Sequence, residues 1–133
     1  MHLLVLNSLI SCSIISNNDI EGSIKLHNSR YELVTGNELR NAISGNKIFP
    51  NLELNRNILL LSDREQYSDD NMYQFVNHGS LSFGYYEIFD RFICLKSSSG
   101  KYTYRILYKS YTGSYAIKFF NEQIVNFAII AKN

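Results

Sequence analysis

The second half of the chain alternates strand-length runs with hairpin-length gaps, and this spacing limits the folds open to it. The gaps read NHGS, DR, SSSG, SYTG and NE, and most contain the glycine, asparagine or serine residues that favour turns. Gaps this short connect neighbouring antiparallel strands. Strands are predicted for the runs Met72–Val76, Leu81–Phe89, Arg91–Lys96, Lys101–Lys109, Ser114–Phe120 and Gln123–Ala131. With the apolar runs NKIFP and RNILLLS before them, they predict an antiparallel meander over residues 47–131.

Alternation along these runs supports the strand prediction. In the run from Lys101 to Lys109, one face holds Tyr102, Tyr104, Ile106 and Tyr108, and the other holds Thr103, Arg105, Leu107 and Lys109. We expect about five to seven strands in a twisted sheet or a partial barrel. Periodicity places six residues in the core: Leu39, Ile43, Phe83, Ile106, Ile117 and Phe127.

One short helix is predicted near residues 35–44. Thr35 and Glu38 have the spacing of a capping box, and Gly45 stands where a left-handed C-terminal cap is favoured. Leu39, Ala42 and Ile43 fall on one face of this helix. The helix is expected to cover an open end or an apolar face of the sheet, which makes the fold class α+β and mainly β.

The composition is that of one folded domain. The chain has 133 residues, of which 45% are hydrophobic and 19% are charged, so we assign residues 17–133 to a single domain. Between Asn17 and Arg30 the chain is polar, and it reads as a tether or a weak edge strand. The formal net charge is +1 and the Lys and Arg residues are scattered, so nucleic acid is not expected as a partner.

The first sixteen residues, Met1–Ser16, are apolar and leave two interpretations open. They are either a signal segment of an exported protein or a first buried strand. The stretch LISC resembles the lipobox of bacterial lipoproteins, which would make Cys12 a lipidation site. Contact with a membrane is expected only through such a lipid anchor.

A series of motifs follows in order along residues 33–120. They are Thr35–Gly45, Phe75 with His78 and Gly79, Gly84 with Tyr86 in the place of a tryptophan, and Ile93 with Cys94. This order resembles that of small uncharacterised exported bacterial β-domains, which open on an "sGxeLrxxLsGxT" helix. The resemblance implies an exported domain with a disulfide, but the second cysteine of the pattern is absent, and Tyr102–Tyr104 stand in its place.

No catalytic, cofactor or metal motif is assembled by the sequence. Cys94 alternates with Phe92 on a predicted strand, and we expect it to be a buried, inert thiol. The histidines His2, His27 and His78 lack the spacing of metal ligands, so neither a metal nor a cofactor is expected.

The acidic stretch from Ser62 to Asn71 is interpreted as an exposed loop. Its candidate partner-binding residues are Asp63, Arg64, Glu65, Tyr67, Asp69 and Asp70. Aromatic residues at the centre of a charged patch often contribute most of the binding energy, which favours Tyr67.

Two function classes follow from these observations. The first is a non-enzymatic domain of the cell envelope or a secreted protein, with a protein-binding or structural role. The second is a cytoplasmic immunity protein that inhibits a toxin or enzyme. In both, the expected partner is another protein, and the oligomeric state stays open. No set of nucleophile, base and oxyanion donors can be assembled, so we do not expect an enzyme.

Overall fold

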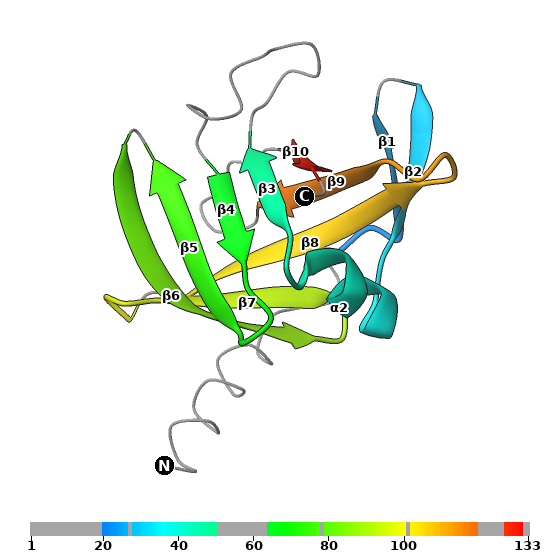
Figure 1. The fold of residues 1–133 in the computed structure, drawn as a ribbon. Coiled ribbons are helices and arrows are strands. Elements are labelled where there is room, and N and C mark those ends of the chain that lie inside the picture. Colours follow the sequence, from blue (N-terminus) through cyan, green and yellow to red (C-terminus); the bar gives the residue numbers. More distant parts are fainter. Residues whose placement is uncertain are drawn as a thin grey trace.

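The computed structural model describes residues 20–26, 28–50, 64–77, 79–100, 102–119 and 127–131. This part of the chain contains one helix, α2 (Gly36–Ile43), and a single sheet of ten strands (Figure 1). The strands are β1 (Ser23–Leu26), β2 (Ser29–Leu33), β3 (Lys47–Pro50), β4 (Arg64–Tyr67), β5 (Met72–Asn77), β6 (Ser80–Phe89), β7 (Phe92–Ser97), β8 (Tyr102–Ser110), β9 (Tyr115–Phe119) and β10 (Phe127–Ala131).

All pairings in the sheet are antiparallel, and from β3 onwards each strand pairs with the next along the chain. Strand β10 also pairs with β3, so the pairings from β3 to β10 return to their starting point. The β1–β2 hairpin is an addition to this ring. It joins the second half of β8, on the edge opposite to β9.

The predicted fold class is confirmed, because the structure is mainly antiparallel sheet with one helix. The sheet has more strands than the five to seven expected. Two of the additional strands, β2 and β4, have the polar sequences SRYEL and REQY. Neither sequence has more than two apolar residues, too few for alternation alone to identify a strand, so their pairing is decided by neighbouring strands.

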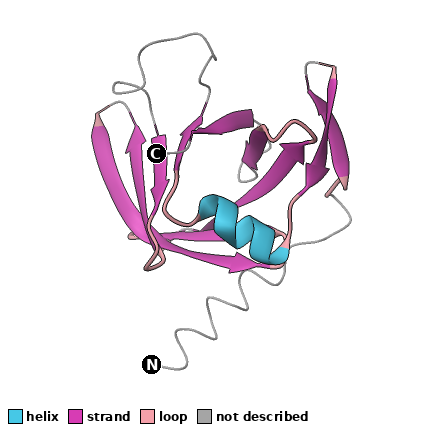
Figure 2. Ribbon diagram, turned by 45° about the vertical axis from the view of Figure 1, so that its right-hand side comes forward, coloured by secondary structure: helices cyan, strands magenta, loops and turns pink. Residues whose placement is uncertain are grey.

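The interior of the ring contains the main hydrophobic core. Its buried members are Val34, Leu39, Ala42, Ile43, Ile48, Tyr67, Tyr73, Tyr86, Ile93, Leu95, Leu107 and Ile117. Helix α2 lies within the curve of the strands and contributes three of these side chains (Figure 2). The helix therefore covers the apolar inner face, as its amphipathic pattern requires.

The N-terminal end of α2 differs from the sequence prediction, whereas its C-terminal end agrees with it. Thr35 is the N-terminal cap residue, but its side chain makes no capping hydrogen bond, so the predicted capping box is wrong. The carboxylate of Glu38 accepts a hydrogen bond from Lys109 Nζ of β8, at 3.3 Å, instead. At the other end, Gly45 has a φ of +79°, and its N–H donates to the carbonyl of Tyr67 at 2.7 Å. The left-handed glycine stop is therefore confirmed.

A second, smaller hydrophobic cluster lies on the outer face of β7 and β8. Phe92, Ile106 and Tyr108 are buried there beneath four partly buried side chains, Ile20, Ile24, Tyr31 and Leu33. The β1–β2 hairpin thus forms a second layer over this part of the sheet. It explains why β8 is buried on both faces over part of its length.

The predicted core is largely confirmed. Leu39, Ile43, Ile106 and Ile117 are fully buried. Phe83 is 45% exposed, so its assignment to the core is wrong. Its neighbour Gly84 is buried and Tyr86 belongs to the interior cluster, so alternation directs Phe83 outward. The side chain of Phe127 lies outside the described residues.

Candidate functional site

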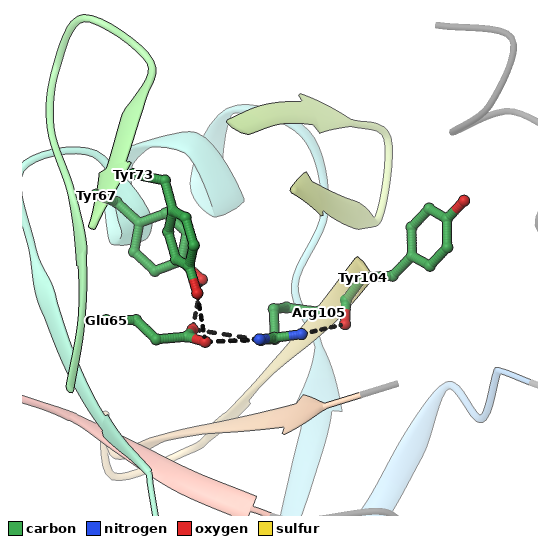
Figure 3. Close-up of polar contacts among 5 residues, drawn as sticks. All are labelled: Glu65, Tyr67, Tyr73, Tyr104 and Arg105. Atoms are coloured by element: carbon green, nitrogen blue, oxygen red, sulfur yellow. Dashed lines mark hydrogen bonds and ion pairs between the residues drawn. The ribbon is translucent and has the colours of Figure 1, made fainter. Parts of the chain in front are cut away.

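The most concentrated polar chemistry in the described residues lies inside the ring of strands. We call it the Glu65 cluster, and it consists of Glu65, Tyr67, Tyr73 and Arg105 (Figure 3). Alternation along β4 directs both Glu65 and Tyr67 inward, and Tyr73 is paired with Tyr67 in the β4–β5 register. Arg105 reaches the same carboxylate from β8.

The other three members of the cluster donate to the Glu65 carboxylate. The Tyr67 hydroxyl donates to Oε1 at 2.6 Å, and the Tyr73 hydroxyl donates to Oε2 at 3.0 Å. Arg105 Nη2 donates to Oε2 at 2.6 Å, while Nε lies 3.3 Å from Oε1 and 3.2 Å from Oε2. The remaining guanidinium nitrogen, Nη1, donates to the carbonyl of Tyr104 at 3.0 Å. The carboxylate thus has partners at both oxygens.

The cluster is shielded from water. Glu65 is 0% exposed and Arg105 is 6% exposed. A buried ion pair of this kind is tolerated only when its charges and hydrogen bonds are matched, and here both conditions hold. Burial by itself lowers the pKa of Arg105, but the Glu65 carboxylate outweighs it, and the pKa is raised above its ordinary value.

Both tyrosines of the cluster are held in their protonated form. Burial, followed by the nearby Glu65 charge, raises the pKa of Tyr67 well above its ordinary value. The same two causes, in the same order, raise the pKa of Tyr73. Because phenols that keep their proton can donate hydrogen bonds, these shifts preserve the network over the physiological range.

Tyrosine ionisation gives the first testable prediction. Since the pKa of Tyr67 and of Tyr73 is higher in the folded chain than in the unfolded chain, the folded state binds more protons at alkaline pH. Stability from these two groups is therefore complete below about pH 10, the ordinary tyrosine value, and is lost as pH rises above it. Each tyrosine should lower the free energy of unfolding by up to about 1.4 kcal/mol per pH unit there.

Urea unfolding between pH 9 and pH 11.5 measures this slope. Tyr67→Phe should make the alkaline slope shallower than in the wild type. Tyr111→Phe is the control, because its side chain is 91% exposed. Equal slopes in wild type and Tyr67→Phe would contradict the assignment.

The predicted partner-binding loop is not one exposed surface. Arg64, Glu65 and Tyr67 belong to strand β4, and both Glu65 and Tyr67 are fully buried. The prediction that Glu65 and Tyr67 lie on an exposed loop is therefore wrong, since the side chains of these two residues cannot touch a partner that binds from outside, whereas Arg64 is half-buried. The reason is that β4 directs Glu65 and Tyr67 into the ring, where their polar groups satisfy one another.

The rest of the predicted loop forms the β4–β5 turn. Asp69 and Asp70 are exposed there. The Ser68 hydroxyl donates to the Asp70 carboxylate, and this contact lowers the pKa of Asp70. Asp63 lies outside the described residues. The structure thus separates the two exposed carboxylates of the turn from the buried one of the cluster.

Sequence reasoning missed Arg105 and Tyr73 as members of a site. Arg105 shares its strand face with Leu107, and both are buried. A charged residue next to the apolar Leu107 on the same strand face was therefore the available signal for a buried ion pair, although Thr103 and Lys109 on that face weaken it. This signal did not identify Glu65 as the partner of Arg105, because the two residues are forty positions apart in the chain.

Cys94 differs from its prediction as a free thiol. It is buried, at 4% exposure, and it is disulfide-bonded. The chain has one other cysteine, Cys12, which lies outside the described residues together with Met1–Ser16 and the three histidines. A disulfide within the chain and a lipid on Cys12 exclude each other, because each consumes the same sulfur.

The outer face of β6 exposes large hydrophobic side chains. Four of them point the same way by strand alternation and form what we call the β6 stripe: Leu81 is 52% exposed, Phe83 45%, Tyr85 61% and Phe89 37%. The half-buried Glu87 lies on the same face between Tyr85 and Phe89, so the apolar part of the stripe runs from Leu81 to Tyr85. Cationic residues flank the stripe. Lys96 is paired with Tyr85 in the β6–β7 register, and Arg64 on β4 is paired with Val76, which is itself paired with Leu81.

A shallow pocket of about 260 Å³ lies where β2, the start of α2 and the end of β8 meet. It is lined by Arg30, Glu32, Leu33, Val34, Glu38, Lys109, Ser110 and Tyr111. Its charged side chains already pair with one another, Arg30 with Glu32 at 2.8 Å and Lys109 with Glu38 at 3.3 Å. The pocket therefore offers a ligand no uncompensated charge.

The described part of the chain contains neither a cluster of metal-ligating side chains nor a membrane-spanning helix. Over residues 20–131, leaving out the gaps given above, no three His, Cys, Asp or Glu side chains gather as a metal site. Nor does the described helix have the length and apolar character needed to cross a membrane.

Comparison with protein families, with curated proteins and with solved structures finds no match to this chain. The resemblance to exported bacterial β-domains therefore stays a prediction.

Proposed function

We propose that the chain is a non-enzymatic β-domain of the cell envelope, or a secreted one, that acts by binding another protein. The observation that carries this proposal is the β6 stripe. Large contiguous apolar surfaces are uncommon on monomeric soluble proteins and often mark protein interfaces. Three of the stripe's residues, Phe83, Tyr85 and Phe89, are of the aromatic type enriched at interface centres.

The charges around the stripe indicate the chemistry of the partner. Lys96 and Arg64 lie on the strands that border β6 and β5, on the same face as the stripe. A complementary partner would present an apolar patch with carboxylates at its rim. The partner is thus a protein with an acidic-rimmed apolar surface.

The state of Cys94 supports the proposed compartment. Structural disulfides persist in oxidising compartments, which include the periplasm and the extracellular space, and are rare in the reducing cytosol. The disulfide at Cys94 therefore favours an exported domain over a cytoplasmic immunity protein. It also favours the form without a lipid on Cys12.

The Glu65 cluster supports a non-catalytic role. A general base needs a lone pair that a substrate proton can reach. The Glu65 carboxylate is fully buried, and it accepts from two tyrosines and one arginine. We therefore assign the cluster to bracing strands β4, β5 and β8 against one another, which keeps the binding face rigid.

A site-specific photo-cross-linker tests the proposal. The probe p-benzoylphenylalanine is placed at Phe83 in one sample and at Tyr111 of the β8–β9 turn, which is more exposed than Phe83, in the other. Irradiation of native cells should give a protein adduct from position 83 and none of the same mass from position 111. An adduct of two copies of this chain, or the same adducts from both positions, would overturn the proposal.

Binding measurements with the purified protein identified from the adduct then test the chemistry of the interface. Tyr85→Ala should weaken binding at least about tenfold, since exposed aromatic residues at an interface centre carry large shares of the binding energy. Lys96→Glu should mainly slow association and reduce its dependence on salt. Tyr111→Ala is the matched control and should bind as the wild type does. Unchanged affinity in Tyr85→Ala would contradict the role of the stripe.

A further inference from the structure

The outer surface of β5 and β6 is two strands wide and has a cationic residue on each flank. Strand β5 directs Met72 and Val76 to the same face as the β6 stripe, where both are half-buried. Arg64 lies on β4 at one flank, and Lys96 lies on β7 at the other. Neighbouring strands are about 5 Å apart, so the two flanking strands lie about 14 Å from each other. This width accommodates a single α-helix, whose diameter with side chains is about 10–12 Å.

The backbone of β6 is already paired on both edges at the centre of the stripe. Tyr85 is paired with residues of both β5 and β7. Phe83 is paired with Gln74 of β5, and its carbonyl accepts a hydrogen bond from the N–H of Ser98 at 3.0 Å. A partner that binds to this face therefore contacts side chains and cannot add a strand to the sheet. An extended segment would leave its own backbone groups unpaired against the apolar surface, whereas a helix satisfies them internally.

The length of the apolar part also agrees with a helix. Leu81, Phe83 and Tyr85 follow one another at about 7 Å along β6, since each strand residue advances by about 3.4 Å. One helical turn advances by about 5.4 Å, so apolar side chains on successive turns would contact successive residues of the stripe. The half-buried Glu87 ends the apolar part at the next outward position. The contact thus spans about three helical turns.

We propose that the segment of the partner that contacts the β6 stripe is an amphipathic helix that lies along β6, with carboxylates on both sides of its apolar face. This inference rests on the proposed protein-binding function, and it adds the secondary structure and the charge pattern of the partner. Lys96 is level with Tyr85, whereas Arg64 is level with Leu81 through Val76, so the two cations lie at diagonally opposite corners of the surface. Charge complementarity then requires an acidic residue on each flank of the helix, about two to three turns apart.

Photo-cross-linking at three positions tests the helix. The probe p-benzoylphenylalanine replaces Leu81, Phe83 or Tyr85 in the full chain, and the residues of the partner that attach to each probe are identified by tandem mass spectrometry. For a helix along β6, the attachment points should fall in one segment of the partner, with about nine residues between those from positions 81 and 85. An extended segment would give a separation of about four residues.

A synthetic peptide with the sequence of the attached segment provides the second measurement. Proline at a central position on its exposed side breaks a helix without removing a contact with the stripe, so it should weaken binding at least about tenfold. Alanine at the same position is the matched control and should preserve the affinity.

Charge reversal on the chain tests the carboxylates of the helix. Arg64→Glu places like charges opposite each other and should weaken binding of the peptide at least about threefold at low salt. Lys25→Glu, at an exposed position of β1, is the control and should bind as the wild type does. The urea midpoint of Arg64→Glu should equal that of the wild type, which shows that the fold is intact.

The outcomes separate this inference from the proposed function. Attachment points about four residues apart, or scattered over several segments of the partner, would overturn the helix and leave the protein-binding function in place. Equal affinities of the proline and alanine peptides would do the same, and so would unchanged binding by Arg64→Glu or a fall in its binding explained by a lowered urea midpoint. The absence of a protein adduct from all three positions would overturn the protein-binding function, and this inference with it.

Discussion

Arg105→Met is expected to lower the free energy of unfolding by about 3–5 kcal/mol. The substitution preserves much of the side-chain volume but removes the cation that faces Glu65. The carboxylate is fully buried, and it would keep only the two tyrosine hydroxyls as donors. An uncompensated buried charge is far more costly than the loss of an exposed ion pair.

Urea denaturation of matched variants measures this cost. Arg30→Met makes the same substitution in the exposed Arg30–Glu32 pair, and it should change stability by less than about 1 kcal/mol. The double variant Glu65→Gln with Arg105→Met removes both charges and should recover part of the loss, which gives the coupling energy of the pair. A loss in Arg105→Met no larger than in Arg30→Met would show that the buried pair does not brace the sheet.

Leu39→Ala is expected to destabilise the fold by about 2–5 kcal/mol. Leu39 is fully buried on the inner face of α2 and belongs to the main core. The substitution removes apolar contacts and leaves a cavity that the surrounding strands can fill only in part. A loss of this size is a large fraction of the stability of a domain this small.

The control for this prediction lies on the same helix. Asn41→Ala alters an exposed side chain two residues away, so its effect should stay within about 0.5 kcal/mol. Denaturant midpoints of the two variants and the wild type provide the comparison. Equal midpoints for Leu39→Ala and the wild type would show that this face of α2 is not part of the core.

The second half of the fold was predictable because its strands and turns are defined by patterns of a few neighbouring residues. Strands β5 to β9 agree with the runs expected from alternation, and each is joined to its neighbour by a short turn. The extent of α2 and its glycine stop are also local properties, set by periodicity and by one left-handed residue. By contrast, the capping box failed because Glu38 is drawn to Lys109, a residue distant in sequence.

Whether a side chain points into the ring or outward could be predicted only where the sequence showed which face of the strand is buried. Phe83 is a large apolar residue of the kind found in cores, but it lies on the outer face of β6, because Gly84 and Tyr86 occupy the inner face. Tyr67 has the sequence context of an exposed loop, but its strand directs it inward. In each case a shift of one position along a strand exchanges the inside for the outside.

Local spacing was enough to predict the antiparallel meander, the helix near residues 35–44 and four of the buried core residues, Leu39, Ile43, Ile106 and Ile117. Local spacing did not show that strands β3 to β10 pair in a ring, nor that Glu65 on β4 meets Arg105 on β8 inside it. The tertiary structure decided these pairings, and it also decided that the β6 stripe stays uncovered while the β1–β2 hairpin covers β7 and β8. The physical reason is that an ion pair or a covering layer depends on which distant strands become neighbours, and local periodicity does not encode that choice.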